Sequence, residues 1–131
     1  MQAAAMRSRY PELSVARSPD GLVFEGTLRP WSGGSAYEVE VTVRDRGDPD
    51  VRVIRPQVRK GAPHVYDDNG LLCLYHPRLR PWKPADLAAL TVVPWTELWL
   101  YFYEEWLETG IWWGPEAPHD APAPRGRTPL R

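Results

Sequence analysis

Residues 37–43 read Y-E-V-E-V-T-V and alternate strictly between apolar and polar side chains. Successive side chains of a β-strand point to opposite faces, so this alternation predicts a strand with one buried face. Residues 22–28 (L-V-F-E-G-T-L) predict an earlier strand, and the turn signals at residues 31–35 join the two. Residues 51–58 predict a third strand, in which Pro56 indicates an edge or a break. Three consecutive antiparallel strands form a meander.

After Pro94 the period of the apolar residues changes from that of a strand to that of a helix. The apolar stripe consists of Trp95, Leu98, Trp99, Phe102, Trp106 and Leu107. The pattern predicts a long helix with Pro94 in its first turn and Gly110 at its C-terminal cap. The opposite side, expected to be polar and solvated, carries Glu97, Tyr101, Glu104 and Glu108. The tryptophans of the stripe are expected in the core, whereas Trp112 and Trp113 lie beyond the cap and are better candidates for contact with a partner.

The remaining segments complete a prediction of the α+β class. Residues 2–9 are rich in alanine and are soon followed by Pro11, which predicts a short N-terminal helix. Residues 83–91 are expected to form a short helix or an irregular link. We expect one domain over residues 1–114, followed by a proline-rich, disordered tail over residues 115–131.

Charge and cysteine content restrict the possible classes of function. The net charge is −1 and no basic patch or acidic tail stands out, so a nucleic-acid partner is not expected. No apolar run approaches the ~20 residues that a membrane helix needs, and the N-terminus lacks the apolar stretch of a secretion signal. One cysteine cannot form an internal disulfide, which favours a reducing compartment. The expected location is the cytoplasm.

That cysteine, Cys73, lies in a segment over residues 63–84 that reads P-H-V-Y-D-D-N-G-L-L-C-L-Y-H-P-R-L-R-P-W-K-P. It follows a turn signal and two leucines, and His64 lies nine positions upstream. A thiol on a short apolar run after a tight turn can be held rigidly and left reachable, as nucleophilic chemistry requires. The alternative is a small buried side chain that only packs. His76 makes a weak zinc half-site because there is no second cysteine, so neither a metal nor a cofactor is expected.

This segment resembles the active-site segment of the ubiquitin-conjugating enzymes. In that family a His-Pro-Asn element precedes a Gly-x-(Ile/Val)-Cys-Leu run, and a Trp-Ser-Pro element follows it. The corresponding parts here are His64, residues 70–74 (G-L-L-C-L) and residues 82–84 (W-K-P). Val65 and Tyr66 replace the proline and the asparagine, so the asparagine's role in shaping the site and steadying the oxyanion has no obvious carrier. The resemblance implies the family's fold: an N-terminal helix, an antiparallel β-meander, a long active-site segment and a C-terminal, Trp-rich helix.

Residues 93–114, together with P-H-V-Y and L-C-L-Y-H-P, are similar to one bacterial branch of that fold. This branch comprises the ubiquitin-conjugating-like proteins of type II CBASS antiphage operons. Its pattern has a cysteine, a glutamate in a Tyr-Glu-x-Trp-x-x-Thr-Gly run, and histidines. The resemblance therefore implies four catalytic residues: Cys73, His64, Glu104 and His119. The family's glycine-rich run before the last histidine is replaced here by residues 115–118 (P-E-A-P).

The resemblance implies that Cys73 forms a thioester with the C-terminus of a cGAS-like cyclic-oligonucleotide synthase and passes it to an amine of an acceptor protein. His64 would donate to the oxyanion or orient the loop, and Glu104 would accept a proton from the amine. The alternatives are a histidine that only fixes the turn and a solvated carboxylate. No G-x-x-x-x-G-K-[ST] loop occurs, so activation comes from elsewhere or needs no dedicated enzyme. A non-catalytic module that binds a protein tail and a thiol hydrolase that removes a conjugate remain open.

Overall fold

A computed structural model of the 131-residue chain describes residues 1–66, 70–74, 82–83 and 85–114. The elements follow in the order helix α1 (Gln2–Arg9), strands β1 (Ser14–Ser18), β2 (Gly21–Leu28), β3 (Tyr37–Arg44) and β4 (Asp50–Arg55), a short 3-10 helix η1 (Ala88–Leu90), and helix α2 (Val92–Thr109). The α+β class predicted from the sequence is confirmed. So are the N-terminal helix, the meander and the long C-terminal helix.

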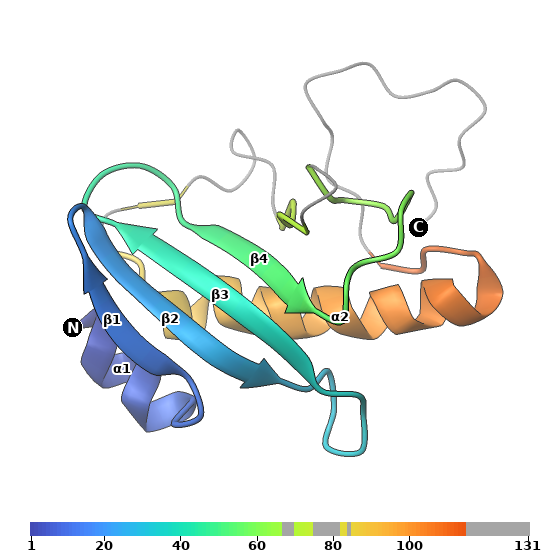
Figure 1. Ribbon diagram of the computed structural model, residues 1–131, viewed down its shortest axis with the longest axis horizontal. Helices are drawn as coiled ribbons and strands as arrows, with labels where there is room; N and C mark the ends of the chain where they lie inside the picture. The colour runs from blue at the N-terminus through green and yellow to red at the C-terminus, as the bar shows by residue number, and fades with distance from the viewer. Residues whose placement is uncertain (67–69, 75–81, 84, 115–131) are drawn as a thin grey trace.

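The four strands form one antiparallel sheet in sequence order (Figure 1). β2 and β3 pair along their whole length, from Gly21 opposite Arg44 to Leu28 opposite Tyr37. The three predicted strands are present, but the third ends at β4's last residue, Arg55, and is shorter than residues 51–58. The shortening follows from Pro56, which has no N–H to donate to a ladder. The sequence pattern does not predict β1, which is mostly exposed and lies at one edge of the sheet.

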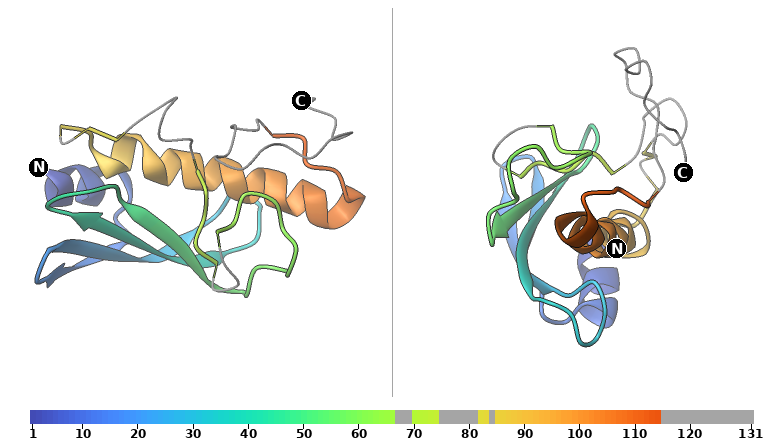
Figure 2. Two further views of the ribbon diagram at one scale, coloured as in Figure 1. Left: turned by 90° about the horizontal axis from the view of Figure 1, so that it is seen from above. Right: turned by 90° about the vertical axis from the view of Figure 1, so that its right-hand side faces the viewer.

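Helix α2 lies across one face of the sheet, with α1 beside one of its ends (Figure 2). Gln2 ties α1 to the segment before α2: its side-chain amide donates to the Asp86 carbonyl at 2.7 Å and accepts from the Ala88 N–H at 2.9 Å. The core between the layers is apolar, as the alternation of the strands requires. Its most deeply buried side chains include Met6, Phe24, Val39, Val41, Val51, Val92, Val93 and Leu100.

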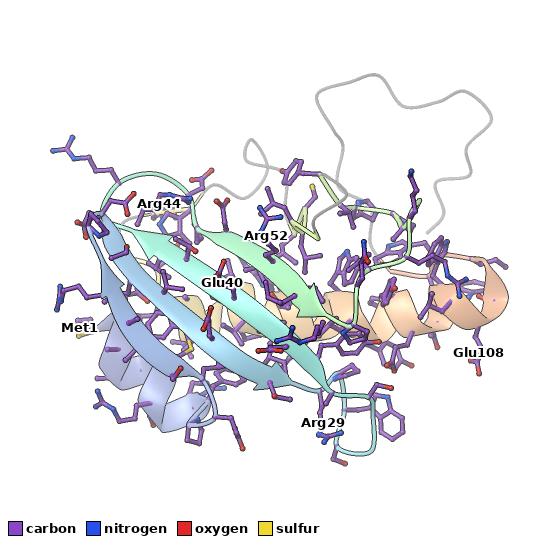
Figure 3. The ribbon with its side chains drawn as sticks, viewed as in Figure 1. Met1, Arg29, Glu40, Arg44, Arg52 and Glu108 are labelled. Carbon is purple, nitrogen blue, oxygen red and sulfur yellow. The ribbon has the colours of Figure 1, made fainter. Side chains whose placement is uncertain are left out.

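The face of the sheet turned away from α2 carries charged side chains (Figure 3). Glu40 of β3 and Arg52 of β4 are register partners on this face. Arg44 forms an ion pair with Asp50 at 2.8 Å. The pKa of Glu40 is raised by desolvation and then by its hydrogen bond with Glu25, while Arg52 acts in the opposite direction. The charged face and the apolar face of the meander are thus separated as the alternating sequence predicts.

The buried face of α2 differs from the predicted apolar stripe. The helix buries Val92, Val93, Thr96, Trp99, Leu100 and Tyr103. Leu98, which the stripe includes, is 49% exposed, and its other members except Trp99 are only partly buried. Aromatic and aliphatic side chains together extend around most of this helix, and the part that packs on the sheet includes the smaller Val92, Val93 and Thr96. Pro94 does lie in the first turn, and Gly110 forms the predicted C-cap with a left-handed φ of 78°.

Candidate functional site

Cys73 follows a short segment that is hydrogen-bonded to the edge strand β4. The Val53 N–H donates to the Gly70 carbonyl at 3.0 Å, and the Leu72 N–H donates to the Val51 carbonyl at 2.9 Å. Residues 70–72 therefore continue the sheet beyond β4, although they are too short to count as a strand (Figure 1). The sheet therefore fixes the backbone immediately before the thiol.

A second set of backbone hydrogen bonds lies on the other side of this segment. The Cys73 N–H donates to the His64 carbonyl at 2.9 Å, and the Tyr66 N–H donates to the Leu71 carbonyl at 2.8 Å. Residues 64–66 and 71–73 thus form a small antiparallel pair, which we call the Cys73 hairpin. The hairpin brings together Cys73 and His64, two of the four predicted site residues.

Gly70 is the residue that lets the Cys73 hairpin approach β4. Its φ is +83°, and a Cβ at this position would lie 2.5 Å from the Val53 carbonyl oxygen. Gly61 has a similar φ of +88°, but a Cβ at that position would meet nothing within 4 Å, so it is a matched control for strain alone.

We expect Gly70→Ala to lower the free energy of unfolding by ~2 kcal/mol or more, because backbone strain adds to a clash with β4. Gly61→Ala should cost only the strain, about 1 kcal/mol. Urea denaturation followed by circular dichroism measures both losses. Equal losses for the two variants would show that Gly70 is not held against β4.

The Cys73 side chain is largely enclosed, with 7% of the residue exposed. Burial raises the pKa of the thiol, and a side-chain hydrogen bond with Tyr66 acts in the opposite direction. Tyr66 is 59% exposed. The expectation that the turn would leave the thiol freely reachable is therefore wrong, because the surrounding side chains leave little of the residue in contact with solvent.

His64 has a left-handed backbone with φ of 58°, which few residues other than glycine adopt. Its carbonyl accepts a hydrogen bond from the Cys73 N–H, and its ring packs against the Trp112 ring with centroids 5.3 Å apart. Strained backbone of this kind concentrates at functional sites, although a turn alone can also require it. The position of His64 is therefore compatible with a ring that assists the reaction at Cys73 and with a histidine that only fixes the turn.

Trp112 is part of the core and not a surface for partners, so that prediction is wrong. It is 7% exposed and packs against Trp99 and Phe102, with ring centroids 5.7 and 6.0 Å away. The chain turns back after α2, and a Cβ on Gly114 would lie 2.6 Å from the Phe102 ring (Figure 1). This reversal carries Trp112 inwards. Trp113, the other residue predicted for partner contact, is 58% exposed.

Glu104 is half-buried and not on a fully solvated face, contrary to the sequence prediction. Its Oε2 accepts a hydrogen bond from the Tyr37 hydroxyl at 2.7 Å. Burial and this hydrogen bond raise the pKa of Tyr37. The Tyr37 ring lies edge-on to Tyr103 at 6.3 Å, and Tyr103 stacks on Trp99 at 4.9 Å. The buried tyrosine of β3 explains why Glu104 turns towards the sheet.

Tyr66 is the residue at this site that the sequence reasoning missed. The comparison with the His-Pro-Asn element places Tyr66 at the position of the asparagine. On that basis Tyr66 indicates only that the asparagine's role is missing. The structure identifies Tyr66 by its position in the Cys73 hairpin, opposite Leu71, and the sequence carries no signal of that register. His119, and with it the proposed tail over residues 115–131, lies outside the described residues, as does His76.

Two further observations concern the part of the chain that the structure describes. No three His, Cys, Asp or Glu side chains there come together in a way that could hold a metal ion. None of its helices has the length and apolar character required to cross a membrane.

The helix–sheet–helix arrangement, with a single cysteine on a hairpin at the sheet edge, defines an α+β protein of the ubiquitin-conjugating type. The chain belongs to the family of type II CBASS E2 proteins, whose family model matches residues 2–120. The resemblance inferred from the sequence is thereby confirmed. No curated protein matches the chain.

Proposed function

We propose that this protein is a ubiquitin-conjugating-type acyl transferase of a CBASS antiphage system. Cys73 takes the C-terminal carboxyl group of a partner as a thioester and passes it to an amine of an acceptor protein. The proposed partner is the cGAS-like nucleotidyltransferase of the same system. The observation that carries the proposal is the position of Cys73 in a chain of this family: its N–H is bound to the His64 carbonyl, and the residue before it, Leu72, is bound to β4.

The proposed reaction has two acyl transfers at one sulfur. The Cys73 thiolate attacks the carbonyl carbon of an activated C-terminus, a C–S bond forms, and the activating group leaves with its electron pair. An amine then attacks the same carbon, an amide forms, the C–S bond breaks, and the amine's proton passes to a base. Because burial raises the thiol pKa, little thiolate is present near neutral pH. An already activated donor tolerates that small fraction.

Three further residues are proposed to assist Cys73. His64 would position Cys73 through its carbonyl, and its imidazole would donate to the oxyanion. Glu104 would accept the proton of the attacking amine. The Tyr37 hydroxyl already orients its carboxylate. His119 is proposed on the family pattern alone.

The loading step can be tested without an activating enzyme. When the nucleotidyltransferase is prepared with a C-terminal thioester, its C-terminal acyl group should be transferred to Cys73. The mass of the loaded protein should rise by the mass of the donor acyl group. The adduct should map to Cys73 and be released by excess thiol or hydroxylamine. Below the thiol pKa, the initial rate should rise roughly tenfold per pH unit, since the rate follows the thiolate fraction. An adduct on lysine alone, or none at any pH, contradicts the proposal.

The low exposure of Cys73 favours a second candidate, a non-catalytic module that binds a protein tail on the same fold. A packing cysteine needs no access for a chain terminus. In that case the same incubation gives a complex that survives gel filtration but separates completely under denaturing conditions. The covalent and non-covalent outcomes therefore distinguish the two functions directly.

A further inference from the structure

The register of the Cys73 hairpin determines which side chains share a face with the sulfur. Val65 and Leu72 form an antiparallel bridge, and Leu72 is buried in the core. Side chains alternate between faces along paired strands, so Tyr66 and Cys73 both lie on the face opposite to Leu72. They are diagonal neighbours in this pair, at a separation that an aromatic side chain can span. The hydrogen bond between their side chains follows from this geometry.

Tyr66 also lines two hollows of the surface next to the hairpin. One hollow of about 350 Å³ extends from Tyr66 along residues 57–62. A second, of about 110 Å³, extends from Tyr66 along residues 48–51 and includes Leu72 and Leu74, the two neighbours of Cys73 in the chain. Tyr66 is therefore an exposed side chain that lines both hollows and also hydrogen-bonds the enclosed sulfur.

We propose that the Tyr66 hydroxyl is a catalytic hydrogen-bond donor to the Cys73 sulfur. This inference rests on the proposed function and adds a residue to it. The sulfur is the nucleophile when the acyl group is loaded and the leaving group when the amine takes it. In both steps the species that carries the charge is the thiolate, and an O–H donor stabilises a charged acceptor more than a neutral one. Tyr66 thereby acts on the reacting atom itself and not through the fold.

The effect is largest in the second step. When the amine attacks the thioester, the C–S bond breaks and its electron pair stays on sulfur. The Tyr66 O–H donates to that developing thiolate, and the amine's proton leaves to a separate base. A leaving thiol with a lower pKa departs faster. In the loading step the same hydrogen bond increases the thiolate fraction but lowers its intrinsic nucleophilicity, so the two effects partly cancel.

Tyr66→Phe tests the proposal because it removes one oxygen and keeps the ring. Tyr101→Phe is the matched control, since Tyr101 is a partly exposed tyrosine on α2. The first measurement uses the free protein: the pH dependence of Cys73 alkylation by iodoacetamide. We expect its midpoint to rise by about one pH unit in Tyr66→Phe, because a donor to the thiolate is lost, and to be unchanged in Tyr101→Phe.

The second measurement is the rate at which a loaded acyl group passes to free lysine. We expect a roughly tenfold lower rate in Tyr66→Phe and a smaller change in the loading rate. A titration midpoint that is unchanged, or that moves equally in Tyr101→Phe, overturns the proposal. The titration needs no partner, so it decides about Tyr66 even if Cys73 never carries an acyl group. Matching far-ultraviolet circular dichroism spectra show that a shift does not come from unfolding.

Discussion

Replacing Trp112 by alanine is expected to lower the free energy of unfolding by about 3–5 kcal/mol. The residue is 7% exposed and its ring contacts those of Trp99, Phe102 and His64. Truncation would leave a cavity between α2 and the Cys73 hairpin, where the loss of transfer free energy adds to the loss of packing. Because most small domains are stable by only about 5–15 kcal/mol, this one change should remove a large share of the stability.

Trp113 supplies a control of the same residue type at the next position. It is 58% exposed, and Trp113→Ala should change stability by no more than about 0.5 kcal/mol. Urea denaturation monitored by circular dichroism compares the two variants without depending on tryptophan fluorescence. Similar losses in both variants would contradict the assignment of Trp112 to the core. A loss in binding to the partner for Trp113→Ala alone would support its remaining role as a contact residue.

The strands show what the sequence predicts well. In β3 every second residue is buried, and the alternation alone indicated both its location and its inward face. β1 (S-V-A-R-S) gives no such signal, because four of its five residues are exposed and it lies at an edge. Its pairing with β2 depends on the neighbouring strand and not on its own apolar pattern. An exposed edge strand of this kind has no apolar alternation from which it could be predicted.

Helix α2 shows where an amphipathic pattern stops being sufficient. The position, first turn and cap of the helix were predictable from Pro94, the apolar period and Gly110. Which face is buried was not predictable, because aromatic and aliphatic residues together extend around most of the helix. The two errors that mattered, an exposed Leu98 and a half-buried Glu104, have the same origin. Glu104 finds a buried hydroxyl on Tyr37, a contact between residues 67 positions apart that no local pattern contains.

At the site, the sequence identified Cys73 and His64, and the structure places them opposite one another. It failed on Tyr66 and Trp112 for a geometric reason. Tyr66 reaches the sulfur diagonally across the hairpin, and Trp112 reaches His64 only because the chain reverses after Gly110. Both contacts depend on register and chain direction, which a motif comparison does not provide.

Substitution of Cys73 should separate chemistry from binding more sharply than any other change. Cys73→Ala is expected to lower transfer to an amine by at least about 1000-fold, because no nucleophile remains to carry the acyl group. Cys73→Ser keeps a hydroxyl at nearly the same position. It should load slowly and form an oxyester that excess thiol does not release, so that a covalent adduct with the donor accumulates. Intact-protein mass spectrometry, before and after treatment with thiol, measures both variants.

Adduct formation and partner binding by the same two variants identify the alternative. Whatever the function, alanine should cost little stability, whereas serine places a hydroxyl in a largely enclosed site at roughly 1–3 kcal/mol. If Cys73 only packs, both variants would still bind the partner non-covalently, and neither would differ from the wild type in adduct formation. An oxyester in Cys73→Ser, none in Cys73→Ala, and equal partner binding by both would instead require a nucleophilic sulfur. Since the hairpin holds the Cys73 backbone by its own N–H, neither substitution removes the hydrogen bond to His64, and a loss of transfer can be assigned to the side chain.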